Sequence, residues 1–203
     1  MSTLKYFIGY LAISLLASCQ NREYKLSESD YSWMPYKGNE TLVFISNTGD
    51  KDTIFILQKD TLIAYPDPQS FNGITYEALV TSCRHSDPSL QDGEHRYLEN
   101  RFFSIKKSRD GNARLHFELA AKDAWFYKLG GSRLDSINKL TPGRLRTQDT
   151  IYNDIYIIES VDWLNFKLRS NYISRIYWSK SQGLVRYDKQ DSVYWELSKK
   201  YHL

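Results

Sequence analysis

Two runs of alternating apolar and polar residues, joined by an Asp-Gly turn, constrain the fold of this chain more than any other feature. Phe103 and Ile105 alternate with polar residues before the turn Arg109–Asn112, and residues 113–119 carry an apolar side chain at every second position after it. A period of two is typical of strands with one buried face, and Asp-Gly is a strong hairpin signal. The sequence therefore predicts an antiparallel hairpin in the middle of the chain.

Strand patterns recur on both sides of this hairpin. The 16 Tyr and five Trp also favour sheet, because large rings pack well on a pleated, half-buried surface. The other predicted strands are Leu42–Phe44 and Thr53–Ile56 around the turn Asn47–Asp50, Asp60–Tyr65, Ile74–Ser82, Ile151–Glu159, Tyr172–Ser179, Leu184–Asp188 and Ser192–Leu197. The last four are joined by short connections, and an antiparallel meander is the simplest arrangement for them.

One segment has a helical pattern instead. Leu134, Ile137 and Leu140 recur every three residues behind Ser132, which is a suitable helix cap. We therefore predict a mainly β domain in which an antiparallel curved sheet forms a sandwich or half-barrel with one short helix.

Four motifs stand out near the end of the chain: Tyr152–Ile157, Ile176–Lys180, Gly183–Tyr187 and Trp195–Leu197. Together they resemble the C-terminal part of uncharacterised small lipoproteins of Bacteroidota-type bacteria. The resemblance implies a secreted β-rich scaffold and no catalytic residues. In architecture alone, the predicted sheet is also similar to the curved-sheet carriers of lipid or lipoprotein.

The first residues form a bacterial lipoprotein signal. Lys5 precedes the apolar run Tyr6–Leu16, which is too short to span a bilayer and has the length of a signal-peptide core. The run ends in Leu16-Ala17-Ser18-Cys19, so residues 1–18 are expected to be removed and Cys19 is the predicted lipidation site. Acyl chains such as palmitate on Cys19 would hold the domain on a membrane without crossing it.

The remaining chain divides into a polar tether, residues 19–37, and a single β-rich domain, residues 38–203. The 27 basic and 24 acidic residues include only Lys5 within the signal, so the mature chain has 26 and 24. This near balance argues against nucleic acid as a partner. Gln20 follows the lipidated cysteine in place of the aspartate that retains lipoproteins in the inner membrane, which favours the outer membrane.

A metal site is conceivable between the two segments Cys83–Asp87 and Asp92–His95. Together they offer a thiol, two imidazoles and several carboxylates, with Cys83, His85 and His95 as the candidate ligands. Their spacing matches no established metal motif, and a polar surface loop is the simpler interpretation. Cys83, the single cysteine after Cys19, cannot form an intrachain disulfide and is expected to be a small buried apolar residue.

Catalytic and cofactor motifs are absent from the sequence. Gly130-Gly131-Ser132 lacks the flanking glycine of a nucleophile elbow, and no glycine-rich loop ends in Lys followed by Ser or Thr. His116 is expected to face solvent from a strand and not to act as a base. We therefore expect no cofactor, and a binding role is favoured over catalysis.

Two groups of side chains are candidates for binding. Arg133, Lys139, Arg144 and Arg146 surround the predicted helix, where they either grip a phosphate or lipid headgroup or form a solvated face. Four aromatic residues of the predicted meander either pack in the core or contact a ligand or partner; they are Tyr177, Trp178, Tyr187 and Tyr194.

Two functional hypotheses follow. The first is a lipid-anchored binding module of the cell envelope for an envelope protein, an apolar ligand or a glycan. The second is a metal-assisted envelope enzyme, which requires His85 and His95 to converge on one ion.

Overall fold

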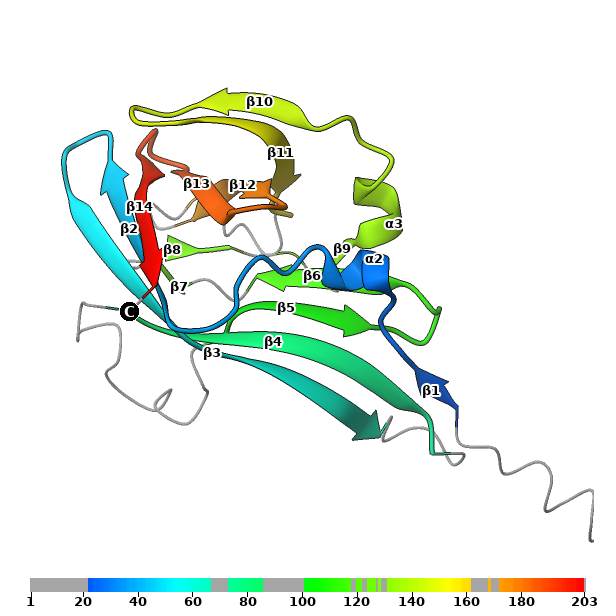
Figure 1. Ribbon diagram of the computed structural model, residues 1–203. Helices are drawn as coiled ribbons and strands as arrows, with labels where there is room; N and C mark the ends of the chain where they lie inside the picture. Colours follow the sequence, from blue (N-terminus) through cyan, green and yellow to red (C-terminus); the bar gives the residue numbers. More distant parts are fainter. Residues whose placement is uncertain are drawn as a thin grey trace, which may run out of the picture.

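The computed structural model describes residues 22–66, 73–85, 101–117, 120–121, 124–126, 128, 131–161, 168 and 172–202. Nearly all the strands belong to one sheet (Figure 1). The elements are β1 (Glu23–Tyr24), α2 (Glu28–Tyr31), β2 (Glu40–Ser46), β3 (Lys51–Pro66), β4 (Thr75–His85), β5 (Arg101–Lys107), β6 (Ala113–Phe117), β7 (Ala120–Ala121), β8 (Ala124–Trp125), β9 (Ser132–Arg133), α3 (Leu134–Ile137), β10 (Gly143–Arg146), β11 (Ile151–Glu159), β12 (Ile173–Ser179), β13 (Gly183–Lys189) and β14 (Tyr194–His202).

The main sheet is a curled half-barrel, which confirms the predicted fold class. Its strands follow the order β10-β11-β12-β13-β14-β2-β3-β4-β5-β6-β9, and β1 pairs with β4 in parallel beside this path. All the other pairings are antiparallel, as neighbours joined by short turns require. Strands β7 and β8 form a separate two-stranded sheet.

Both predicted hairpins are present. In β5–β6, Phe103 pairs with Phe117 and Gly111 takes a φ of +78° at the turn, a conformation that glycine adopts without strain. In β2–β3, Leu42 pairs with Ile54. The segment Asp60–Tyr65 is not a separate strand, because β3 continues through it without a break.

The C-terminal meander is confirmed, whereas the predicted helix is shorter than expected. Strands β10 to β14 are successive neighbours in the sheet. Helix α3 makes a single turn, and its N-cap is Arg133, which forms no side-chain cap. Ser132, the expected cap, lies in β9 instead. The segment therefore owes its position to the buried Leu134 and Ile137 and not to capping.

The segment predicted as a tether is instead part of the fold, so the domain begins at β1 and not at residue 38. We call residues 22–37 the strap. In it, Ser27 and Asp30 form a capping box that starts α2, and Trp33 and Tyr36 are fully buried. The burial of these two rings could not be predicted from the sequence, because they stand in a polar segment without a sustained strand or helix pattern.

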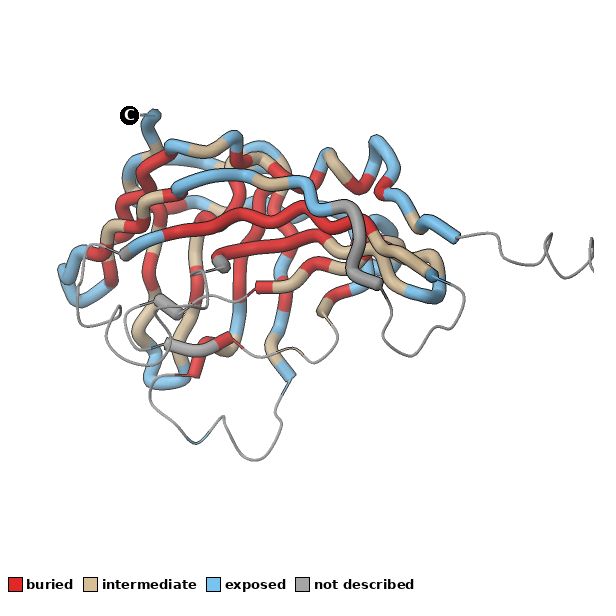
Figure 2. Tube along the Cα trace, turned by 90° about the horizontal axis from the view of Figure 1, so that it is seen from below, coloured by how far each residue is buried: buried red, intermediate tan, exposed pale blue. Residues whose placement is uncertain are grey.

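Aromatic side chains are prominent in the core on the concave side of the half-barrel. Figure 2 shows long buried stretches along the strands of the sheet. Phe103 of β5 stacks on Trp178 of β12 with ring centroids 4.2 Å apart, although these strands are not neighbours in the sheet. Tyr36 of the strap contacts both Phe102 and Trp178. The strap thus joins the two arms of the curled sheet from the inside.

Candidate functional site

Several residues singled out from the sequence lie outside the described residues. They include the predicted lipidation site Cys19 and the candidate metal ligand His95. His85 ends β4, where its backbone pairs with Ile54. Cys19 as a lipid anchor and His95 as a ligand therefore stay predictions.

Cys83 is a buried free thiol, as expected. It is 4 % exposed within the core, and burial, with a further contribution from the Asp52 charge, raises its pKa to about 12. Without a metal ion, this thiol is therefore protonated at neutral pH. The described part of the chain contains no group of three metal-ligating side chains.

The four candidate aromatic residues divide between the two faces of the meander. Trp178 and Tyr187 point inwards and are 0 % exposed. Their polar atoms, Nε1 and Oη, have no hydrogen-bond partner among the described residues. Both side chains therefore contribute packing and have no exposed surface for a partner.

Tyr177 and Tyr194 lie on the outer face and enclose the guanidinium of Arg186. Its Cζ atom is 5.1 Å from the ring centroid of Tyr177 and 3.9 Å from that of Tyr194. Arg186 also forms ion pairs with Asp188 (2.6 Å) and Glu196 (3.1 Å). Arg186 is thus held by two carboxylates and two rings, so the cluster stiffens the meander and leaves Tyr194, which is partly exposed, as the accessible aromatic residue.

The four basic residues around α3 are spread over β9, the segment after α3 and β10. Arg133 is in β9 and pairs with Asp135, Lys139 follows α3, and Arg144 and Arg146 are exposed on the edge strand β10. Charged residues on an edge strand discourage pairing with another chain. Their arrangement suits a solvated face more than a single anion site.

His116 lies in β6 and is partly buried, so the prediction of a solvent-facing residue holds only in part. Burial, with further contributions from the nearby charges of Lys106 and Arg114, lowers its pKa to about 4. The imidazole is therefore neutral at pH 7.

A polar hollow lies between β11 and β14, and we call it the β11–β14 cleft. Its volume is about 550 Å³, within the usual range for small-molecule sites. It opens because the β12–β13 hairpin turns back at residues 180–182, before β11 and β14 end. Its lining residues are Thr150, Ile151, Tyr152, Asn153, Asp154, Ser181, Gln182, Leu197, Ser198 and Lys200.

Charged groups at the base of the cleft are held in fixed positions. Asp154 accepts hydrogen bonds from the hydroxyl of Ser179 (2.9 Å) and the backbone N–H of Ser181 (3.0 Å). Lys200 donates to the carbonyl of Gln182 (3.0 Å) and lies over the Tyr36 ring. Burial lowers the pKa of Lys200, and the charge of Glu40 partly offsets this shift by raising the pKa. The cleft thus presents fixed donors and acceptors from three separate segments.

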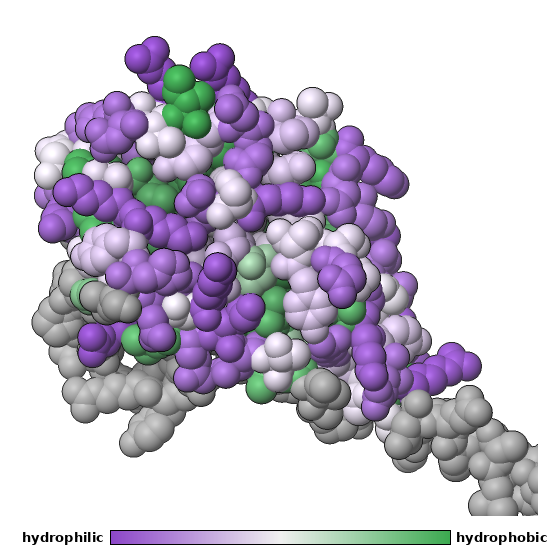
Figure 3. Space-filling model, in the orientation of Figure 1, coloured by the Kyte–Doolittle hydropathy of each residue, from purple (hydrophilic) through white to green (hydrophobic). Residues whose placement is uncertain are grey.

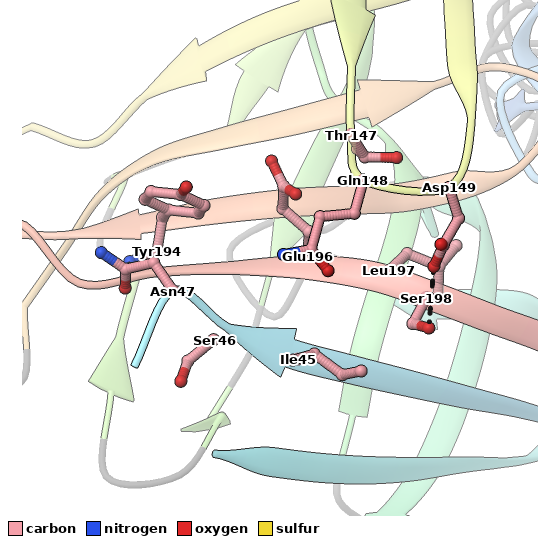
Figure 4. A pocket seen from close by; sticks show the side chains of 10 residues that line it. All are labelled: Ile45, Ser46, Asn47, Thr147, Gln148, Asp149, Tyr194, Glu196, Leu197 and Ser198. Carbon is pink, nitrogen blue, oxygen red and sulfur yellow. Dashed lines mark hydrogen bonds between the residues drawn. The ribbon is translucent and has the colours of Figure 1, made fainter. Parts of the chain in front are cut away.

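A smaller hollow of about 20 Å³ adjoins the cleft and shares Leu197 and Ser198 with it. Figure 4 shows the β10–β11 turn lying over β14, where the Ser198 hydroxyl donates to Asp149 (3.2 Å). Tyr194 and Glu196 line the same hollow. Because it has room for little more than one water molecule, the hollow extends the polar surface without forming a separate site.

Comparison with protein-family models, with curated proteins and with solved structures finds no match to this chain. Among the described residues, no helix has both the length and the apolar character needed to cross a membrane.

Sequence reasoning identified Tyr194 near the cleft but missed its polar residues. Tyr152 lies within the motif Tyr152–Ile157, but no motif or spacing around Gln182 and Lys200 indicates a site. They meet only because one hairpin is shorter than the strands beside it, which is a consequence of strand register. The only sequence signal for the cleft is the short turn at residues 180–182 together with the long last strand β14.

Proposed function

We propose that this protein is a lipid-anchored component of the cell envelope that binds a glycan in the β11–β14 cleft. Acyl chains on Cys19 would provide the anchor, and the outer membrane is the membrane that Gln20 favours. The protein would act as a binding module. Its partner in the envelope would be the molecule that carries the glycan.

The observation that carries this proposal is the character of the cleft. Hydroxyl, amide, carboxylate and ammonium groups surround a space of about 550 Å³ that is open to solvent. A polyhydroxyl ligand can replace water at such donors and acceptors, and the half-buried Tyr152 and exposed Ile151 provide apolar surface for the face of a sugar ring.

The same structure makes an apolar ligand the weaker choice. The concave face, where a curved-sheet carrier would hold lipid, is occupied by Trp33, Tyr36, Phe103 and Trp178. On the face seen in Figure 3, hydrophobic side chains are scattered among hydrophilic ones. A polar ligand in the cleft fits these surfaces better.

The test uses the full chain, purified with its lipid from the host envelope, and oligosaccharides released from the glycans of that envelope. Saturation-transfer NMR should show contact with one glycan, and Asn153→Trp should abolish it by filling the cleft. Gln190→Trp, an exposed substitution in the β13–β14 turn, is the matched control and should bind normally. Glycan contact that survives in Asn153→Trp, or no contact with any fraction, would refute the proposal.

A further inference from the structure

A β-bulge in β14 decides where the side chain of Lys200 lies. The pairing with β2 shifts by one residue between Leu197 and Lys199, which makes Ser198 an extra residue in the strand. Beyond the bulge, Lys200 pairs with the fully buried Leu42, and directly paired residues point to the same face of a sheet. Lys200 therefore lies on the core side of β14, whereas unbroken alternation from the buried Leu197 would place Lys199 there. Bulges next to binding sites often redirect a side chain in this way.

The ammonium group of Lys200 is held from two sides. Its Nζ atom donates to the backbone carbonyl of Gln182 at 3.0 Å and lies 4.9 Å from the ring centroid of Tyr36. These contacts come from the turn of the β12–β13 hairpin and from the strap, so they fix the group in the wall of the β11–β14 cleft, which it lines. An ammonium has three N–H donors. Gln182 uses one and the ring faces another side, which leaves a donor for a ligand in the cleft.

The charge of Lys200 is not balanced by a carboxylate in contact with it. Among the residues that the structure describes, Lys200 forms no ion pair. Burial lowers the pKa of Lys200, the charge of Glu40 opposes this shift, and the nearby charge of Lys37 adds to it. The carboxylate of Glu40 is bound to the strap, where it accepts the backbone N–H groups of Lys37 (2.6 Å) and Gly38 (2.8 Å). A bound anion would therefore offset the cost of burying the ammonium.

Asp154, the other charged residue that lines the cleft, already has hydrogen-bond donors. Its carboxylate accepts from the Ser179 hydroxyl (2.9 Å) and from the Ser181 N–H (3.0 Å). Asp154 reaches the hairpin turn from β11, and Lys200 reaches it from β14 through Gln182. Within the described part of the chain, the two groups form no ion pair with each other. The group that lacks a partner of opposite charge is therefore the ammonium of Lys200.

The lining of the cleft restricts the kind of anion that it can hold. Of the described residues that line it, Lys200 is the single basic one, and none is an arginine. Phosphate groups are commonly bound by the planar guanidinium, which contacts two oxygens at once, whereas a lysine is a compact point charge. Asp154 would also repel a dianion more strongly than a monoanion. A single carboxylate on a sugar ring, as in a uronic acid, is therefore the suitable anion.

We propose that the β11–β14 cleft selects acidic sugars, with the ammonium of Lys200 binding the carboxylate of a uronic acid unit. This inference rests on the proposed function, because it names the class of glycan that the same cleft binds. Lys200 determines the specificity, and the hydroxyl and amide groups beside it bind the rest of the sugar. The bulge at Ser198 makes the selection possible, since it places Lys200 on the core side of β14.

The experiment compares the same oligosaccharides with and without their carboxylates. Oligosaccharides released from the host envelope are separated by anion exchange. Part of the acidic fraction is then treated with carbodiimide and borohydride, which convert each carboxylate to a neutral hydroxymethyl group. Both samples are titrated into the full chain, purified with its lipid, and binding is followed by saturation-transfer NMR. The acidic fraction should bind at least about tenfold more tightly than the reduced one, the effect of one hydrogen bond between charged groups.

Substitutions at Lys200 and its neighbour assign the effect to one side chain. Lys200→Met removes the charge but keeps an unbranched side chain over Tyr36, and it should bind the acidic and reduced fractions equally. Lys200→Arg restores the charge and should keep the preference for the acidic fraction. The matched control is Lys199→Met, which removes the adjacent exposed charge and should bind like the unaltered chain. Urea unfolding of the three variants checks that the fold is kept.

The outcomes separate the choice of glycan from the existence of the site. Equal binding of both fractions by the unaltered chain, abolished by Asn153→Trp, would overturn the role of Lys200 and leave the glycan site standing. No binding of either fraction would overturn the proposed function and, with it, this inference. Binding that survives carboxyl reduction but is lost in Lys200→Met would identify a phosphate or sulfate group and overturn the assignment to a carboxylate.

Discussion

The strap and the C-terminal meander contribute to the same core in different ways. The meander buries alternate residues of regular strands, such as Trp195 and Leu197 of β14. The strap has only a two-residue strand and a one-turn helix, yet it buries Trp33 and Tyr36 completely. Burial in the meander follows from backbone periodicity, whereas burial in the strap depends on single side chains that fit sites formed by distant strands.

Polar contacts compensate for the irregular backbone of the strap. Glu77 of β4 accepts hydrogen bonds from the Leu26 N–H (2.7 Å) and from the Tyr31 hydroxyl. The Trp33 indole donates to Asn138, and the Tyr36 hydroxyl accepts the N–H of Leu184. A buried segment without a ladder needs such partners for its polar groups. The strap is therefore fixed at specific points, and single substitutions should have large effects there.

The largest effect is expected from Trp33→Ala. Trp33 is fully buried, contacts Tyr156 with ring centroids 4.7 Å apart and lies under Lys180. Removing the ring leaves a cavity between the strap and β11, at about 3–5 kcal/mol. Urea unfolding should show this loss, while Ile157→Ala, at a half-exposed position of the meander, should change the free energy of unfolding by less than about 1 kcal/mol. Equal losses would mean that the strap is no more sensitive than the meander.

The contact between the strap and the meander can be tested at Gly183. Its φ is +92°, and an added Cβ would lie 2.2 Å from the hydroxyl oxygen of Tyr36. Gly183→Ala should therefore cost about 2–4 kcal/mol through strain and overpacking. Gly49→Ala is the matched control, since its φ is +90° and nothing lies within 4 Å. Thermal unfolding of the two variants should differ by the steric contribution, and similar losses would argue against a tight contact.

Two buried tyrosines should respond to the same substitution with opposite signs. Tyr36→Phe removes the acceptor of the Leu184 N–H, a 2.8 Å bond, and leaves a buried donor unsatisfied, at about 1–3 kcal/mol. Tyr187→Phe removes a buried hydroxyl that has no hydrogen-bond partner in the described part of the chain, so stability should stay the same or rise by about 1 kcal/mol. Chemical denaturation measures both, and a clear loss in Tyr187→Phe would reveal a hydrogen bond to that hydroxyl.

The smallest predicted effect is the pH dependence of the stabilisation that Asp30 provides. Burial raises the pKa of Asp30, but the Ser27 donors and Lys107 outweigh it, so the pKa lies below its ordinary value of 3.8. The stabilisation is present above the unfolded pKa and is lost as the pH falls through the folded value. Asp30→Asn should cost up to about 1 kcal/mol at pH 7 and progressively less below about pH 4. A difference between the two proteins that stays constant with pH would show that the charge of Asp30 is not what stabilises the strap.

The sequence predicted the regular part of this fold well. Period-two runs around Asp110-Gly111 and Asn47–Asp50 identified two hairpins, and short connections identified the meander, because alternation reports directly on a half-buried strand. The strap was read as a tether, since Trp33 and Tyr36 stand alone among polar residues. The cleft was missed for a related reason: Gln182 and Lys200 lie next to each other only through strand register, which a single sequence does not specify.

The strap also affects when the chain can fold. The hydroxyl of Tyr36 accepts a hydrogen bond from the backbone N–H of Leu184, which lies 148 residues later in the sequence. This core contact therefore joins an early segment of the chain to a late one. Contacts of such wide separation form slowly, because a long loop must be closed before they stabilise anything. During synthesis the N-terminal residues appear first. Tyr36 would therefore lack its packing and hydrogen-bond partners until β13 had been made. If the protein is exported, as we propose, this delay would keep the chain unfolded until most of it has crossed the membrane.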